Sequence, residues 1–165
     1  MLKLVNYGQN EGMYGPDVNL TGDPGTDNTT LLNAGYLGGK VVALKSSAVA
    51  ARGTVLVPCD AATQVPVGFL LNGPGEFSSA ITPSGSGKMS YVRAFPKFLI
   101  DSQAFVAAPT AAYAVGNYVY CGTGVHAGLV TADVPTGVGA NVAPIGVITE
   151  IPSASFPWLG VDSKL

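Results

Sequence analysis

Charge is what this sequence has least of. Asp, Glu, Lys and Arg make up 11% of its 165 residues, less than half of the roughly 25% that is typical of globular domains. The eight cationic side chains are scattered along the chain, whereas phosphate neutralisation needs several adjacent cations, so we expect no nucleic-acid partner. Because charge keeps small proteins apart in solution, a surface this poor in charge is expected to be covered within an assembly.

Long hydrophobic runs are also missing, although 47% of the residues are hydrophobic. No run approaches the roughly 18–20 apolar residues that a membrane helix needs. The apolar stretch in residues 1–7 is too short for a signal peptide. We therefore expect no membrane partner, and assembly in a cytoplasm. The two cysteines, Cys59 and Cys121, are too few for a disulfide framework. We interpret them as buried free thiols, with a disulfide between them as the alternative.

Catalytic chemistry has few residues to use, because His126 is the only histidine. A Cys121–His126 nucleophile is possible across a turn, but the thiol follows an apolar run in which it would stay protonated. The segment 122–127 matches a dinucleotide pattern, yet glycines and prolines follow it where a helix should begin, so a hairpin turn is favoured. The segment 84–89 fails a phosphate-loop pattern at both ends. We expect no enzyme and no cofactor.

Metal ligands are equally sparse. Asp17, Asp23 and Asp27 form the nearest approach to an acidic cluster, and such oxygen ligands suit calcium. Their spacing fits no calcium loop, and Asp and Asn are common in turns because they hydrogen-bond their own backbone. We therefore favour turn chemistry here and expect no metal site.

Short strand-like runs fill most of the chain after residue 40, and no apolar pattern keeps a helical period over three turns. The sequence predicts an all-β protein, with strands at 41–44, 54–57, 65–72, 89–95, 97–100, 104–107, 118–121, 129–131 and 143–148 and in the apolar C-terminal segment 156–161. Tyr118 and Tyr120 share one face of their strand. We interpret them as core residues with hydroxyls at the rim, and an exposed aromatic platform is the alternative.

Two of these strand groups resemble each other. Each group begins with a Gly-led strand and ends with a Pro-x-Gly strand. Corresponding strands of the two groups lie about 77 residues apart, which indicates two copies of one unit, at 38–71 and 115–151. The signature residues are Gly39, Pro66 and Gly68 in the first copy, and Gly116, Pro144 and Gly146 in the second. A three-strand unit cannot bury its own apolar face, so the pair predicts a small closed β structure.

The remaining segments are rich in turn formers. Residues 1–35 carry few apolar anchors, and we predict an extended arm there, followed by a β domain over 36–165. A Gly/Pro-rich loop insert is expected at 72–88. Within the low-charge arm, Tyr7 and Tyr14 are candidate contact residues, because tyrosine is favoured at interfaces.

The Gly39–Leu44 strand followed by Pro66–Phe69, with its echo at Pro144–Val147, resembles the small capsid decoration (cement) proteins of tailed bacteriophages. The resemblance covers about half of the chain. It implies a β-barrel-like or β-tulip head, a homotrimer, and an arm laid on the shell. It also implies a structural role on the virion surface, where the major capsid protein is the partner.

Two other functions remain open from the sequence. One is a carbohydrate-binding or adhesin module on a virion or cell surface, which would use tyrosines and Asn/Asp loops. The other is a different β-barrel virion component, such as a tail-tube or head-tail protein.

Overall fold

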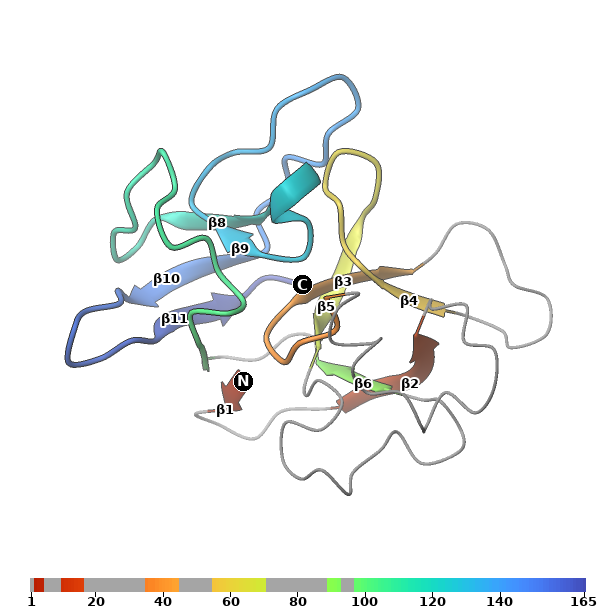
Figure 1. Ribbon diagram of the computed structural model, residues 1–165, viewed down its shortest axis with the longest axis horizontal. Coiled ribbons are helices and arrows are strands. Elements are labelled where there is room, and N and C mark those ends of the chain that lie inside the picture. The colour runs from red at the N-terminus through yellow and green to blue at the C-terminus, as the bar shows by residue number, and fades with distance from the viewer. Residues whose placement is uncertain (1, 5–9, 17–34, 45–54, 71–88, 93–96) are drawn as a thin grey trace.

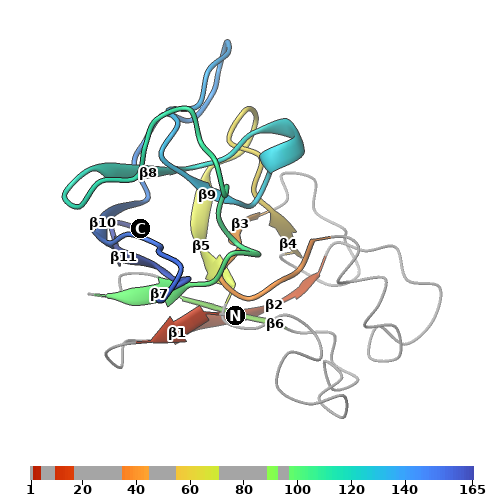
Figure 2. The same ribbon diagram turned by 60° about the vertical axis from the view of Figure 1, so that its left-hand side comes forward.

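The computed structural model describes residues 2–4, 10–16, 35–44, 55–70, 89–92 and 97–165 (Figure 1). These residues form eleven β-strands and one short 3-10 helix, η1 (Gly124–His126). The expected all-β class is confirmed. The strands make up two groups that lie side by side, a small barrel and a six-stranded sheet (Figures 1 and 2).

Five strands close into the barrel, and most of them come from the first half of the chain. In hydrogen-bonding order they are β2 (Asn10–Pro16), β4 (Val55–Pro58), β3 (Val41–Leu44), β5 (Pro66–Leu70) and β6 (Met89–Val92). The β2–β4 pair is parallel, and the other pairs are antiparallel. Closure leaves these short strands without an open edge.

The second group is an antiparallel sheet. Its order is β1 (Leu2–Leu4), β7 (Phe98–Ile100), β11 (Leu159–Ser163), β10 (Gly146–Glu150), β8 (Tyr118–Cys121) and β9 (Val130–Thr131). The C-terminal strand lies between β7 and β10, as its apolar sequence predicts. The side chains of Lys97 and Glu150 form an ion pair beside these strands.

One hydrophobic core joins the barrel to the sheet. Phe69 of β5 and Phe98 of β7 are fully buried, and their rings meet edge to face with centroids 4.6 Å apart, a favourable arrangement for aromatic pairs. The same cluster includes Val41 from the barrel and Val119 and Ile148 from the sheet. The two strand groups therefore stabilise each other.

The predicted arm, 1–35, is described only in part. Its segment β1 pairs with β7, and its segment β2 pairs with β4 and β6. These pieces are therefore sheet strands, attached by backbone pairing to later parts of the chain. Residues 5–9 and 17–34, and the predicted loop insert 72–88, lie outside the described residues.

Two sets of three strands have the same arrangement. In the first set β3 lies between β4 and β5, and in the second β8 lies between β9 and β10. The cross-strand register is also equivalent, because Val42 faces Gly68 in one set and Val119 faces Gly146 in the other. These four residues occupy matching positions in the two sequence copies.

The Gly-led start of each set is a tight turn. Gly39 has φ 89° and Gly116 has φ 88°, a left-handed conformation that glycine adopts without steric cost. The amide of Lys40 donates to the carbonyl three residues earlier at 3.1 Å, and that of Asn117 does the same at 3.0 Å. This hydrogen bond, with glycine at the third position, is the pattern of a type II turn. The amides of Gly39 and Gly116 then bind the third strand of their own set at 2.8 and 2.9 Å.

One predicted strand is wrong. Residues 104–107 make only an isolated parallel bridge, between Phe105 and Val130. Two hydrogen bonds attach this segment to Val130, but Ala107 and Ala108 are exposed and Pro109 follows them. Because Pro109 has no backbone N–H to donate, the pairing between this segment and β9 cannot extend through it.

Candidate functional site

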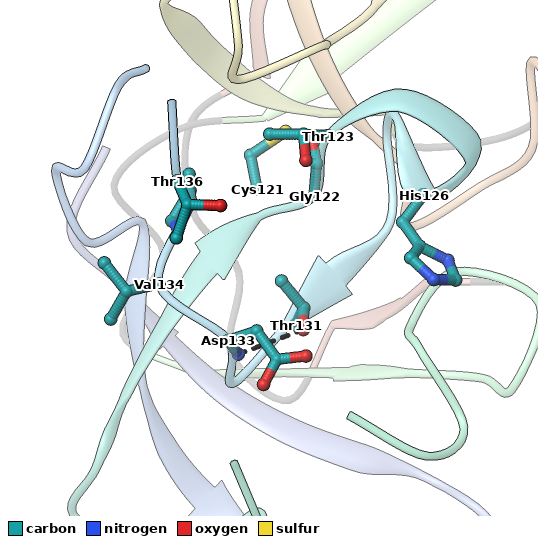
Figure 3. A pocket seen from close by; sticks show the side chains of 9 residues that line it. Cys121, Gly122, Thr123, His126, Thr131, Asp133, Val134 and Thr136 are labelled. Carbon is teal, nitrogen blue, oxygen red and sulfur yellow. Dashed lines mark hydrogen bonds between the residues drawn. The ribbon is translucent and has the colours of Figure 1, made fainter. Parts of the chain in front are cut away.

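A small pocket of about 140 Å³ lies where β8, η1 and the segment after β9 meet (Figure 3). Its lining includes the Cys121 and His126 pair that the sequence singled out, together with Thr131 and Asp133. In Figure 3 the Cys121 thiol and the His126 imidazole point in different directions. Among the described contacts no hydrogen bond joins them.

The polar groups of this pocket hold the backbone in place. The Asp133 carboxylate accepts hydrogen bonds from the amides of Thr110 at 3.0 Å and Ala111 at 2.6 Å. These backbone donors, Ala111 above all, hold the pKa of Asp133 below its ordinary value. The Thr131 hydroxyl accepts a hydrogen bond from the Asp133 amide at 3.1 Å. The polar groups of the pocket therefore have a structural role, in which Asp133 holds the segment around residue 110.

The two cysteines lie together in the core as free thiols, so that interpretation is confirmed. The Cys121 thiol donates to the Cys59 carbonyl at 3.1 Å. The hydrogen bond from the Cys121 side chain, together with burial, raises the pKa of the Cys59 thiol. Both thiols are buried in the core, so these cysteines act as small apolar packing residues.

A shallow groove of about 300 Å³ lies at the start of β8. The interpretation of Tyr118 and Tyr120 as core residues is wrong, because Val119 and Cys121 occupy the inward positions and Tyr118 is 49% exposed. Successive residues of a strand face opposite sides, so both tyrosines line the groove instead. The Lys164 ammonium lies 5.5 Å from the ring centroid of Tyr118. The other lining residues are small or uncharged: Ala111, Ala112, Gly116, Asn117, Ala132 and Val134.

Beyond the other end of β8, three loops gather at one end of the molecule (Figures 1 and 2). We call them the apical loops and define them as residues 60–65, 122–128 and 136–142. Hydrogen bonds connect them, from the Asn141 amide to the Ala61 carbonyl at 2.7 Å and from the Ala61 amide to the Gly122 carbonyl at 3.2 Å. Each loop carries at least one exposed valine, and the set is Val65, Val125, Val138 and Val142.

The residues singled out from the sequence do not converge on one site. Tyr14 lies in β2, opposite Met89, whereas Tyr7 lies outside the described residues. Pro66 opens β5 and Pro144 lies two residues before β10, while the glycines of the signature serve the turns and strand pairs described above. Within the described part of the chain no group of three His, Cys, Asp or Glu residues could hold a metal ion.

Sequence reasoning missed the apical loops, and it considered an exposed platform of Tyr118 and Tyr120 only as the alternative. One signal was present, because residues 102–149 contain a single charged side chain, that of Asp133. Within the described residues no helix is long and apolar enough to cross a membrane. The chain matches none of the protein-family models, curated proteins or solved structures with which it was compared.

Proposed function

We propose that this protein is a capsid decoration protein, a structural component that binds the outer surface of a phage shell and stabilises the lattice of the major capsid protein. It acts as a homotrimer on the virion, after assembly in the host cytoplasm, and it needs no catalysis and no cofactor. In this proposal the head is a β-barrel or β-tulip built from a duplicated strand unit, and residues 1–35 form the arm.

The observation that carries the proposal is the pair of equivalent strand sets. The turn glycines, Gly39 and Gly116, and the paired glycines, Gly68 and Gly146, take the same positions in both. These are the residues on which the resemblance to decoration proteins rests. Gly39 and Gly116 adopt positive φ, which glycine does without steric cost, and Gly146 has no room for a Cβ. A physical need for glycine at these three places supports duplication of one unit.

Surface chemistry supports the same proposal. Fully exposed apolar side chains such as Val125 and Val138 stabilise a protein only when something else covers them. A shell lattice offers neighbouring surfaces of that kind, and an uncharged face loses little hydration when it docks. Residues 1–35, with Tyr7 and Tyr14 as anchors, are the proposed shell contact, which β1 and β2 attach to the head through backbone pairing.

The test is co-sedimentation of the purified protein with shells that lack it, and separately with isolated tails. Saturable binding to shells at a fixed ratio to the major capsid protein is expected. The double variant Tyr7→Ala, Tyr14→Ala should weaken binding, whereas Tyr118→Ala is the matched control outside the arm. A folded, monodisperse protein that sediments with neither particle would refute the proposal, and binding to tails alone would favour the head-tail or tail-tube function.

A carbohydrate-binding module is the second candidate, and the groove is the observation that favours it. Tyr118 and Tyr120 line it together with Asn117, whose side chain makes no hydrogen bond to the described residues. Aromatic faces and amides are the groups that bind neutral sugars. A glycan array distinguishes the carbohydrate-binding module from a decoration protein. Binding to a sugar that Tyr118→Ala abolishes would support the module, whereas decoration requires no sugar binding.

A further inference from the structure

Two thiols meet where the barrel joins the sheet. We propose that Cys59 and Cys121 form a redox site, in which a small disulfide that enters the Cys121 pocket oxidises the pair to a disulfide that links the two strand groups covalently. In the reduced protein the same thiols pack in the core. The inference goes beyond the proposed function and does not depend on it, and it can be tested without shells.

The two cysteines come from different strand groups, and main-chain contacts hold them side by side. Cys59 follows β4 directly, and its amide donates to the Val41 carbonyl of the barrel at 2.9 Å. Cys121 is the last residue of β8 in the sheet. Two residues after Cys59, the Ala61 amide donates to the Gly122 carbonyl at 3.2 Å. The backbone segments that carry the thiols are therefore hydrogen-bonded neighbours.

The side chains complete the approach. The Cys121 thiol donates to the Cys59 carbonyl at 3.1 Å and also has a hydrogen bond with the Cys59 thiol. A disulfide without backbone strain needs cysteines that already lie close together, and these contacts meet that need. Oxidation removes the thiol donor, but the Cys59 carbonyl also accepts the Gly128 amide at 2.6 Å. The disulfide therefore leaves this buried carbonyl hydrogen-bonded.

Only one of the two cysteines lines a pocket. Cys121 belongs to the pocket of about 140 Å³ between β8, η1 and the segment after β9 (Figure 3), and Cys59 does not. This volume is well above the roughly 10–15 Å³ that one water needs, so the end of a small disulfide can enter. Among the described lining residues Asp133 is the only anionic one, which favours an uncharged or cationic reagent over an anionic one. Cys121 is therefore the first thiol to react.

The chemistry is two thiol–disulfide exchanges in sequence. The thiolate form of Cys121 attacks one sulfur of the small disulfide RSSR, which gives a mixed disulfide between Cys121 and R and releases one thiolate. The Cys59 sulfur then attacks Cys121 Sγ, forms the protein disulfide and releases the second thiolate. The released thiolates take up the two protons that the cysteines lose. The pair is oxidised by two electrons, and one small disulfide is reduced to two thiols.

The order of these two steps suits the buried thiol. The largest cause of the raised pKa of Cys59 is its hydrogen bond with the Cys121 side chain. The mixed disulfide replaces the S–H group of Cys121, so this cause is removed before Cys59 acts as the nucleophile. Because the thiolate is the reactive form of cysteine, reaction at Cys121 favours the second exchange.

The link constrains a large part of the chain. Cys59 and Cys121 are 62 positions apart, and the strands β5, β6 and β7 lie between them in sequence. A cross-link that closes such a long loop removes conformational freedom from the unfolded chain. For a chain of this length, we expect the oxidised protein to have a Tm on the order of 10 °C above that of the reduced protein.

The experiment incubates folded, full-length wild type with hydroxyethyl disulfide, an uncharged reagent, and follows the thiols by alkylation and intact mass. We expect both thiols to be lost, a peptide that joins Cys59 to Cys121, and the rise in Tm, all reversed by dithiothreitol. Thiols that stay free, a mixed disulfide that persists, or cross-linking between molecules would each overturn the proposal. A disulfide that leaves Tm unchanged would also overturn it.

Two variants test the route of entry. Cys59→Ala keeps only the pocket thiol and should accumulate the mixed disulfide, whereas Cys121→Ala keeps only the buried Cys59 and should react at least about tenfold more slowly. Neither variant should gain Tm on treatment, which makes each the control for the other. Circular dichroism verifies folding, and Cys59→Ser and Cys121→Ser replace any variant that does not fold. Equal rates in the two variants would refute entry through the pocket and the proposal with it.

Discussion

Gly146→Ala should destabilise the protein by crowding. Gly146 lies in β10 between β8 and β11, and a Cβ there would come within 2.4 Å of Val161 Cγ1 and 2.8 Å of the Asp162 carbonyl oxygen. The valine can change rotamer, but the carbonyl belongs to the backbone of the neighbouring strand. Relief therefore requires β10 and β11 to separate locally. Overpacking of this kind costs about 1–3 kcal/mol, and we expect the upper end because backbone must move.

Gly116→Ala should destabilise for a different reason. Nothing would lie within 4 Å of its Cβ, so crowding is absent and the φ of 88° is the whole cost. The left-handed conformation costs a residue with a side chain about 1–2 kcal/mol. The two signature glycines therefore have similar roles in sequence but distinct physical requirements.

Asparagine separates these two requirements. Asn tolerates the left-handed region better than Ala does, so Gly116→Asn should cost less than Gly116→Ala. At Gly146 the longer side chain adds to the crowding, so Asn should cost more than Ala. The order of the two substitutions therefore reverses between the two positions.

Urea titration followed by far-ultraviolet circular dichroism measures the free energy of unfolding of all four variants and of wild type. A thermal scan gives the matching Tm values. For a chain of this length each kcal/mol lowers Tm by roughly 2–4 °C, so the Tm of Gly146→Ala should fall by up to about 12 °C. The same order of substitutions at both positions would refute the reasoning. A Gly146→Ala variant as stable as wild type would show that β10 and β11 do not approach as closely as described.

Two further predictions concern the segment that leads into β8. Tyr113→Phe removes a hydrogen bond of 2.8 Å to the Val106 carbonyl and should cost about 1 kcal/mol, whereas Tyr118→Phe, the control, should cost almost nothing. Burial raises the pKa of Tyr113, so wild type should lose stability as pH rises above the ordinary value of 10.0, and Tyr113→Phe should lose less. Asp133→Asn should reduce hydrogen-exchange protection of the Ala111 amide at neutral pH. Because the pKa of Asp133 is lowered, its contribution is present above 3.8 and disappears as pH falls through the folded-state value, where the variant and wild type should converge.

Local features of the fold could be predicted from the sequence. Alternation and β-branched runs located the strands of both three-strand sets, and Pro66 correctly marked the first residue of β5. The equivalent turns at Gly39 and Gly116 follow from glycine's freedom at positive φ. Each of these depends on a few adjacent residues, so the chain itself carries the information.

Non-local features could not be predicted. The parallel pairing of β2 with β4 joins segments whose sequences carry no mutual signal. Tyr118 and Tyr120 were assigned to the wrong face because alternation gives the period of a strand but not which face meets the core. The apical loops come together through hydrogen bonds between residues such as Ala61 and Asn141, far apart in sequence, so no local motif could reveal them.

The exposed valines are the part of this protein that its own fold does not explain. Val125 and Val138 are almost completely exposed, so replacing them with lysine would remove no internal contact and would favour solubility. Single apolar residues on a surface are ordinary, but these two share one hydrogen-bonded loop cluster with Val65 and Val142. In the proposed assembly, a surface outside the chain would cover these valines. The shortage of charge in residues 102–149 agrees with the same proposal, because surface that is buried on assembly loses less free energy when it has few charges to desolvate.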